Sequence, residues 1–389
     1  MEESSLQELV GRVVLDMGAA FGAATVVIGD RLGLWKAMAG AGPLSAGELA
    51  RRTGTGERLV AEWLAAQAAA GYVSYSGGSG AGGTEGSGGS GGSRGGGAEG
   101  SRGSGESGAK GSGGSGAGGT YTLTEEQATV FADDSSPVFM TGLAEVISSV
   151  YRDEDKIVDA YRGGKALAWG DHDPALFEGT ERFFRPGYAA NLPTDWIPAL
   201  RGVQEKLTGG ARVADVGCGH GASTLVLART YPEARLTGFD SHGPSITRAR
   251  ELAVQAGVAD RVTFETARAD DYPGTGYDLV CLFDCLHDMG DPVGALRHIR
   301  TTLAPDGTVL LVEPFAYGRL PDDLNPVGRL FFNASATVCV PGALSQGATK
   351  ALGAQAGQER LFEVAGQAGF TRSRQAAATP FNLVLELKP

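Results

Sequence analysis

The sequence predicts an α/β protein in which a doubly wound, mostly parallel, seven-stranded sheet follows a smaller, mainly helical domain. Two observations lead to this expectation. From about residue 171 onward, short β-branched runs alternate with amphipathic helical patterns, which is typical of a parallel sheet with crossover helices. Before residue 76, two short helical patterns precede a strand-like run. Ligands of such a sheet bind at the carboxyl ends of its strands.

The first 75 residues are expected to form the first part of a winged-helix domain, because two helices followed by a hairpin are the winged-helix order. Its second helix, near residues 57–70, carries a single basic residue, Arg58, against two acids and is otherwise apolar. A helix of this kind favours packing over insertion into the major groove of DNA. Together with the preceding apolar stretch Leu6–Ile28, it predicts a homodimer and no nucleic-acid partner.

Residues 76–119 are almost entirely glycine and serine. Such a segment cannot bury enough apolar surface to offset its ordering entropy, so we expect it to be disordered. The runs "GYVSYS" and "TYTLT" on its two sides alternate polar and apolar residues, as paired strands do. We therefore place the insertion at a hairpin tip, the wing. Residues 120–170 would complete the N-terminal domain with linking helices, and residues 171–389 would form the ligand-binding domain.

Composition excludes several classes of protein. The formal net charge of −12 and a pI near 5.0 argue against a general nucleic-acid binder, which needs clustered Lys and Arg. The acidic N-terminus has no signal-peptide pattern, and no run of about eighteen uninterrupted apolar residues occurs, so we expect a cytoplasmic protein without membrane contact. The four cysteines form no C-x-x-C pair, which predicts neither a disulfide framework nor a metal site.

The predicted sheet is built from alternating elements. Helices are expected at 221–232, 244–257 and 291–307. Strands are expected at 211–219, 234–240, 261–267, 277–283 and 308–315, with two more, antiparallel to each other, within 369–389.

A glycine-rich loop, "DVGCGHGAST", joins the first strand to the first helix. Gly217, Gly219 and Gly221 let the backbone turn tightly and approach a ligand without Cβ clashes. Asp215, before the first glycine, can help to hold an ammonium group, and Asp240 ends the next strand. The same spacing also satisfies the dinucleotide pattern G-x-G-x-x-G/A, but no second half-fold follows to carry a nicotinamide.

Four motifs, "DVGCGHGAST", "GFD", "YDLVCLFDCLHDMGDP" and "LAPDGTVLLVEPF", together resemble the class I S-adenosylmethionine-dependent methyltransferases over roughly residues 180–389. The resemblance implies that Asp215, Gly217 and Gly219 cradle the methionine moiety of the cofactor and that Asp240 accepts hydrogen bonds from its ribose. Further cofactor contacts are implied at Ser241, Ala269, Asp270, Phe283 and Asp284. At the adenine position the alignment leaves Arg268 as an alternative to Asp270.

With its N-terminal domain included, the chain resembles small-molecule O-methyltransferases that dimerise through a winged-helix domain. Their "HDW" is "HDM" here, so His287 matches while Met289 replaces a tryptophan. The resemblance implies that His287 deprotonates the acceptor hydroxyl and that Glu313 and Glu359 orient it. The substrate wall is expected to include Phe184, Tyr188 and Phe331.

The expected function is transfer of a methyl group from S-adenosylmethionine to a small molecule, at a hydroxyl oxygen, with His287 as the general base. Two alternatives remain at this point. A transcriptional regulator would bind DNA through the winged helix and use the sheet domain only to sense the cofactor. A nicotinamide-dependent dehydrogenase would bind NADH at the same glycine loop.

Overall fold

The computed structural model describes residues 3–77, 119–163 and 165–389, and its chain divides into two compact units. Residues 1–31 and 129–389 form the first, the sheet unit, and residues 32–128 form the second, the hairpin unit. This division differs from the expected one, which placed residues 1–75 in one domain. The first helix, α1 (Glu3–Arg31), groups with the sheet unit because it packs against α6 (Thr141–Arg152).

The hairpin unit has the predicted order of helices followed by a hairpin. Its helices are α2 (Leu34–Met38), α3 (Ala46–Thr53) and α4 (Glu57–Ala69), and α5 (Glu125–Phe131) follows the hairpin. Ser45 and Glu48 form a reciprocal capping box that starts α3. Trp35 and Trp63 are buried against each other, with ring centroids 4.6 Å apart. Trp63 therefore belongs to the core of this unit and adds no exposed apolar surface.

The predicted hairpin is confirmed. Strands β1 (Ser74–Ser76) and β2 (Thr120–Thr122) pair antiparallel, with Tyr75 opposite Tyr121 and their ring centroids 5.1 Å apart. Tyr121 also bridges to Leu44, ahead of α3. Residues 78–118 lie outside the described residues, so the expectation that the insertion is disordered stays a prediction.

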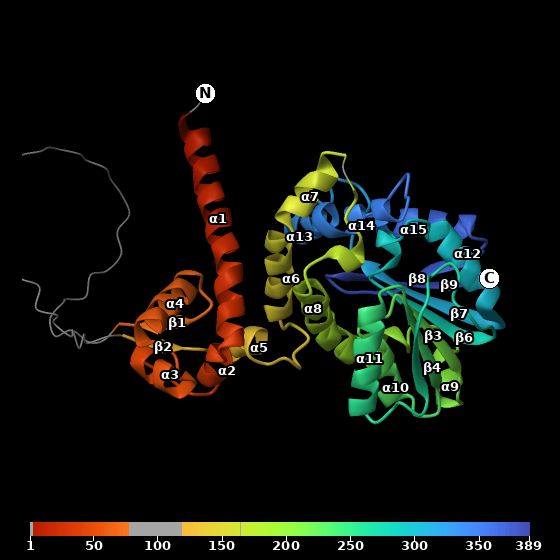
Figure 1. Cartoon of the computed structure of the whole chain (residues 1–389), viewed down its shortest axis with the longest axis horizontal. Helices are drawn as coiled ribbons and strands as arrows, with labels where there is room; N and C mark the ends of the chain where they lie inside the picture. Colours follow the sequence, from red (N-terminus) through yellow and green to blue (C-terminus); the bar gives the residue numbers. More distant parts are fainter. Residues whose placement is uncertain (1–2, 78–118, 164) are drawn as a thin grey trace, which may run out of the picture. The chain divides into compact units, whose positions relative to one another are not determined.

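The sheet unit contains the predicted seven-stranded, mostly parallel sheet, drawn in green to blue in Figure 1. The strand order is β5-β4-β3-β6-β7-β9-β8. Strands β3 to β7 run parallel, whereas β9 pairs antiparallel with both β7 and β8. The strands are β3 (Arg212–Val216), β4 (Arg235–Asp240), β5 (Val262–Thr266), β6 (Tyr277–Phe283), β7 (Leu303–Pro314), β8 (Arg372–Ala378) and β9 (Asn382–Lys388). Strand β7 thus begins several residues earlier than expected.

Successive residues of each strand point to opposite faces of the sheet, so both faces carry apolar side chains that must be buried. Helices therefore cover both faces. In β6, Leu279 and Cys281 pack in one apolar layer with α9 (Val203–Thr208), α10 (Ala222–Thr230) and α11 (Gly243–Gln255). Val280 and Leu282 pack in the other, with α12 (Pro292–Thr302) and α15 (Gly357–Gln367).

Shorter helical elements connect the main helices and strands of the sheet unit. They are α7 (Glu154–Tyr161), η1 (Trp169–Asp171), η2 (Leu192–Trp196), η3 (Leu286–Asp288), α13 (Pro326–Ala334), η4 (Ser335–Cys339) and α14 (Val340–Ser345). Two helical stretches, Ser4–Arg31 and Pro326–Ser345, are long and apolar enough to cross a membrane by length and composition alone, a test that core helices and signal sequences also pass. All four cysteines are free thiols.

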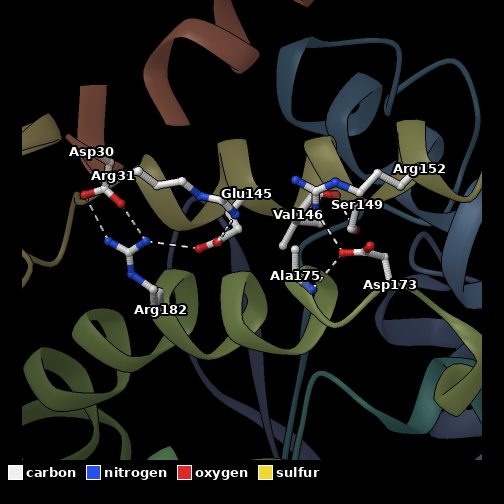
Figure 2. Close-up of polar contacts among 9 residues, drawn as sticks. All are labelled: Asp30, Arg31, Glu145, Val146, Ser149, Arg152, Asp173, Ala175 and Arg182. Carbon is white, nitrogen blue, oxygen red and sulfur yellow. Dashed lines mark hydrogen bonds and ion pairs between the residues drawn. The ribbon is translucent and has the colours of Figure 1, made fainter. Parts of the chain in front are cut away.

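Helix α8 (Ala175–Asn191) is held against α6 by direct backbone contact. A Cβ added to Gly142 would lie 2.6 Å from the nitrogen of Phe183, and one on Gly179 would lie 2.8 Å from the oxygen of Gly142. One turn further along α8, the Arg182 guanidinium donates to Asp30 of α1 at 2.8 and 3.2 Å and to Glu145 of α6 at 3.0 Å (Figure 2). Three helices are thereby joined at one arginine.

We predict that replacing residues 78–118 by a two-residue Asn-Gly turn leaves the protein folded. Ser76 and Thr120 already pair across the hairpin, and a type I′ turn matches the twist of two antiparallel strands. The melting temperature should change by no more than about 2 °C, as for surface changes in general. Loss of the cooperative melting transition would contradict the hairpin-tip placement.

Candidate active site

A cavity of about 250 Å³ lies at the carboxyl ends of β3, β4 and β6. We call it the edge cavity. Its wall includes these residues expected at the cofactor: Gly217, Gly219, Asp240, Ser241, Ala269, Asp270, Phe283 and Asp284. It also includes Phe184 and Tyr188, two of the three aromatic residues expected at the substrate.

The glycine loop turns sharply over the end of β3. Gly217 has φ 76°, and a Cβ there would lie 2.7 Å from the Cys285 sulfur, so only glycine fits. The Gly219 nitrogen donates to one carboxylate oxygen of Asp240 at 2.9 Å, and the His242 nitrogen donates to the other at 2.8 Å. Both oxygens of Asp240 are thus fixed by backbone donors at the cavity wall.

Asp215 is buried beneath this loop, with 1% of its surface exposed, and is not itself among the described residues that line the cavity. One carboxylate oxygen accepts from the Ser223 and Thr224 hydroxyls at 2.7 and 2.6 Å. The other oxygen, Oδ1, has no hydrogen-bond partner within the described part of the chain. Burial raises the pKa of Asp215 to about 6 although the two hydroxyls oppose this shift. The site therefore lacks a positive partner.

His287 lies in η3, directly after β6, and is held by Glu313 of β7. Its Nδ1 lies 2.5 Å from Glu313 Oε2, and Glu313 Oε1 accepts from the Leu286 nitrogen at 2.9 Å. Burial alone would lower the pKa of His287, but the Glu313 carboxylate and a hydrogen bond to Cys339 hold that pKa well above its usual value. The geometry thus favours the imidazolium form.

The neighbours of His287 in sequence reach the edge cavity. Cys285, Asp288 and Met289 line it, whereas His287 is 4% exposed and is not among the described wall residues. Burial raises the pKa of Asp288 to about 7. A second acid, Asp284, also has its pKa raised to about 7, first by burial and then by Glu313.

Asp284 is the one non-glycine residue with positive φ (50°) among the residues that the structure describes. Backbone strain of this kind persists only where surrounding contacts fix it. Here the Tyr188 hydroxyl donates to Asp284 Oδ2 at 2.8 Å, and Asn382 Nδ2 donates to Oδ1 at 3.1 Å. The acid therefore connects an aromatic wall residue of α8 to the end of β6.

The structure does not bring two of the expected residues to the cavity. Glu359 is exposed in the first turn of α15, so the acid that reaches His287 is Glu313. Phe331 is buried in a small cluster with Cys339 and Ala354, because α13 turns its apolar face inward.

The two residues left as alternatives at the adenine position are neighbours in the structure. Arg268 and Asp270 both line the edge cavity, and the guanidinium donates to the carboxylate at 2.9 and 3.0 Å. The hydrogen bonds from Arg268 lower the pKa of Asp270 more than its partial burial raises it. The two alternatives left by the sequence thus form one ion pair.

Several wall residues carried no sequence motif. Trp169, Phe177 and Glu181 come from η1 and α8, and Gln346 follows α14. The Gln346 amide donates to the Asp288 carbonyl at 3.0 Å and accepts from the Gly290 nitrogen at 3.2 Å, which closes one side of the cavity. The one available signal was the tryptophan itself, Trp169, because no helix was predicted at residues 175–191.

Two family models match the chain. A model described as a methyltransferase domain matches residues 207–356, which include the glycine loop, Asp240 and His287. Residues 207–356 thus have the sequence pattern of a methyltransferase domain. A second model, described as an Rv2258c-like winged HTH domain, matches residues 20–80, which confirms the predicted winged helix.

Similar proteins carry methyltransferase names. The chain is 32% identical over 145 residues to the 27-O-demethylrifamycin SV methyltransferase of Amycolatopsis mediterranei, covering 37% of this chain and 48% of that protein. It is 29% identical over 229 residues to acetylserotonin O-methyltransferase of Mus musculus, covering 51% and 58%. The chain thus spans about half the length of these curated relatives.

Solved structures share the fold over nearly the whole chain. The mitomycin 7-O-methyltransferase superposes with a TM-score of 0.63 at 19% identity, covering 99% of this chain and 100% of that one. Human N-acetylserotonin methyltransferase in complex with SAM gives a TM-score of 0.63 at 16% identity, covering 97% of each chain. The methyltransferase fold with an N-terminal winged helix is therefore confirmed.

The cofactor of this methyltransferase domain is S-adenosylmethionine, and the residues present fit it. The orphaned oxygen of Asp215 needs a cationic or donor group, which the cofactor's ammonium would supply near the glycine loop. Gly219 has φ 53°, and a Cβ there would meet open space, so the loop leaves room for a ligand. Asp240 lies at the wall, where it can accept from ribose hydroxyls.

We predict that Asp215→Asn stabilises the ligand-free protein. A carboxyl whose pKa is raised on folding keeps its proton where the unfolded chain has lost it, so this group lowers stability as pH rises from about 4 to about 6. The full penalty above that range is about 3 kcal/mol. At pH 7.5 the variant should gain about 1–2 kcal/mol in a denaturant titration, because the amide keeps only part of the hydroxyl bonding.

The same variant should bind S-adenosylhomocysteine at least about tenfold more weakly at pH 7.5, since it lacks the negative charge. Wild-type affinity should fall as pH drops below about 6, where Asp215 takes up its proton. Calorimetric titrations at pH 5.5 and 7.5 check both. Equal affinity of the two proteins at pH 7.5 would show that Asp215 does not serve the cofactor.

Proposed function

We propose that the whole chain transfers a methyl group from S-adenosylmethionine to a hydroxyl oxygen of a small molecule. The observation that carries this proposal is the His287–Glu313 pair after β6, next to the edge cavity in which we place the cofactor. A neutral hydroxyl needs a base when the methyl group arrives, and histidine can serve near neutral pH. Several relatives are named as O-methyltransferases, which supports oxygen as the acceptor atom.

An acceptor with a flat, apolar ring suits the wall. Phe184 and Tyr188 stack with their centroids 5.7 Å apart, and Tyr188 lies 5.1 Å from Phe283. Val338 and Met289 add apolar surface. These side chains would orient the acceptor and exclude water from it, and such alignment is a large part of catalysis of a displacement reaction.

The cofactor supplies an electrophilic methyl group on a sulfonium, and the chain's residues manage the acceptor and its proton. Because Nδ1 of His287 is bonded to Glu313, Nε2 is the atom left to take the proton. Cys339 is the other hydrogen-bonding neighbour of this ring, and we propose that the acceptor hydroxyl takes its place. Glu313 would then stabilise the imidazolium that forms, as a carboxylate does in other His–acid pairs.

We predict that His287→Ala lowers the methyl-transfer rate by about 10²–10⁴ and leaves S-adenosylhomocysteine affinity within about threefold. Wild-type turnover should rise with pH, because only the neutral ring accepts a proton. Since Glu313 raises the pKa of His287, this limb should lie above the ordinary histidine value, and it should vanish in the variant.

His298→Ala is the matched control, because His298 binds the Tyr272 carbonyl at 2.8 Å and is not a wall residue in the described chain. Its rate should stay within about twofold of wild type. A His287→Ala enzyme that kept more than about a tenth of the rate would reduce His287 to a structural residue and favour an acceptor that needs no base.

We propose that the protein works as a cytoplasmic homodimer joined through α1. Four free cysteines suit a reducing compartment. One helix exposes many large apolar side chains, far more than isolated surface residues explain. They are Leu6, Leu9, Val10, Val13, Val14, Leu15, Met17, Phe21 and Ile28.

We predict that Phe21→Glu converts a dimer into a monomer, because Phe21 is 81% exposed on α1 and a charge there would be buried in the interface. Light scattering at about 10 µM protein checks this. Val254→Glu, on α11, is the control, since it makes the same kind of change at a side chain that is 69% exposed elsewhere. A monomeric wild type, or a dimeric Phe21→Glu protein, would contradict the proposal.

A further inference from the structure

The loop between α7 and α8 carries part of the wall of the edge cavity. Trp169, in η1, lines the cavity together with Phe177 of α8, and their ring centroids lie 5.4 Å apart. Phe177 in turn lies 4.5 Å from His242, which follows Asp240 and Ser241. The indole is therefore on the side of the cavity where the cofactor's ribose would bind.

A buried carboxylate, outside the cavity wall, accepts hydrogen bonds from this loop. Asp153, between α6 and α7, is 1% exposed. Its Oδ2 accepts from His172 Nδ1 at 3.0 Å and from the Asp173 nitrogen at 2.8 Å, while Oδ1 accepts from Lys156 at 2.7 Å. Lys156 also donates to the Asp171 carbonyl at 2.7 Å. Each of the three residues that follow Gly170 is thus hydrogen-bonded to Asp153 or Lys156 at the α6–α7 corner.

A second tie starts α8. The Arg152 guanidinium, at the end of α6, donates to Asp173 Oδ1 at 2.8 Å, and the same oxygen accepts from the Ala175 nitrogen at 3.0 Å (Figure 2). Residues on both sides of the turn are therefore fixed to the α6–α7 corner, and Trp169 is fixed with them.

The charge states of His172 and Asp153 favour a strong hydrogen bond between them. Burial lowers the pKa of His172 more than Asp153 raises it, so the ring is neutral and donates from Nδ1. Burial alone would raise the pKa of Asp153, but hydrogen bonds from Lys156, Asp173 and His172 lower it. A bond from a neutral ring to a charged carboxylate is stronger than one between neutral groups. His172 Nε2 has no hydrogen-bond partner within the described residues, so the bond from Nδ1 to Asp153 is the one hydrogen bond that the ring makes there.

We propose that Asp153 and His172 are positioning residues that hold Trp169 in place for the cofactor. Neither is among the described wall residues, so their influence on the ligand passes through the indole. A wall that is ordered before binding lowers the entropy cost of binding. The proposal rests on the cofactor site assigned above, and it adds a part of the chain that no methyltransferase motif includes.

A double-mutant cycle tests the proposal, with calorimetric titration of S-adenosylhomocysteine into Asp153→Asn, Trp169→Ala and the double variant. We expect about a five- to tenfold weaker affinity for Asp153→Asn and about tenfold for Trp169→Ala. Because Asp153 acts through the indole, the double variant should bind within about twofold of Trp169→Ala alone. Additive losses, or an affinity of either single variant within twofold of wild type, would overturn the proposal.

A second readout needs no ligand. The other three tryptophans are buried: Trp35, Trp63 and Trp196. The part of the fluorescence quenching by acrylamide that is lost in Trp169→Phe therefore reports on Trp169. Asp153→Asn should at least double this component, and an unchanged component would overturn the anchor. If the wild-type protein bound no S-adenosylhomocysteine, the proposed function would be wrong. The quenching measurement would still test whether Asp153 positions Trp169.

Two further variants separate position from stability. Glu145→Gln alters another buried carboxylate of α6, which binds Arg182 at 3.0 Å and does not contact the loop, so it should lower stability with affinity and quenching unchanged. If Asp153→Asn does not fold, Lys156→Met removes the tie to Asp171 at a half-exposed side chain. Affinity should then fall about two- to fourfold and quenching rise, and no change in either would overturn the proposal.

Discussion

The buried carboxylate of Asp215 is the constraint on which the carboxyl edge of the sheet depends. Its bonds to Ser223 and Thr224 join the end of β3 to the first turn of α10, and the glycine loop must turn between them. One oxygen is left without a partner among the described residues, and the pKa of about 6 records the cost of that arrangement. We therefore expect the protein to be less stable without a positively charged ligand at Asp215 than with one.

Other acids at this edge are also buried, and burial raises their pKa values in the same way. Asp284 and Asp288 both have a pKa raised to about 7 by burial, and Asp240 is raised in the same direction. A positively charged ligand, such as a sulfonium, would stabilise the ionised form of these buried carboxyls. Asp284 has a further role, because its bond to Tyr188 connects the acidic edge to the aromatic wall of α8. Asp284 thus links the two sides of the cavity that we propose for the cofactor and the acceptor.

Sequence reasoning succeeded where a motif ties a residue to a strand end. The glycine loop and Asp240 follow β3 and β4 and line the edge cavity, and His287 follows β6 and is buried behind that wall. Alternation of strands and helices was enough to predict that all three lie at the same edge of the sheet. Sequence reasoning failed for Glu359, which the resemblance placed beside His287, because a sequence match does not reveal which way the side chain of a helical residue points. Trp169 and the Asp153–His172 pair come from loops without periodicity, whose positions depend on tertiary contacts alone. The grouping of α1 with the sheet unit depends on such contacts as well.

The assignment of this edge to methyl transfer depends on which ligand binds at the glycine loop, because the spacing from Gly217 also satisfies a dinucleotide pattern. A direct calorimetric comparison of S-adenosylhomocysteine and NADH with the wild-type protein at pH 7.5 tests it. We predict saturable binding of S-adenosylhomocysteine with one site per chain and no heat of binding with NADH. Saturable binding of NADH, with no heat from S-adenosylhomocysteine, would contradict the assignment of this edge to methyl transfer.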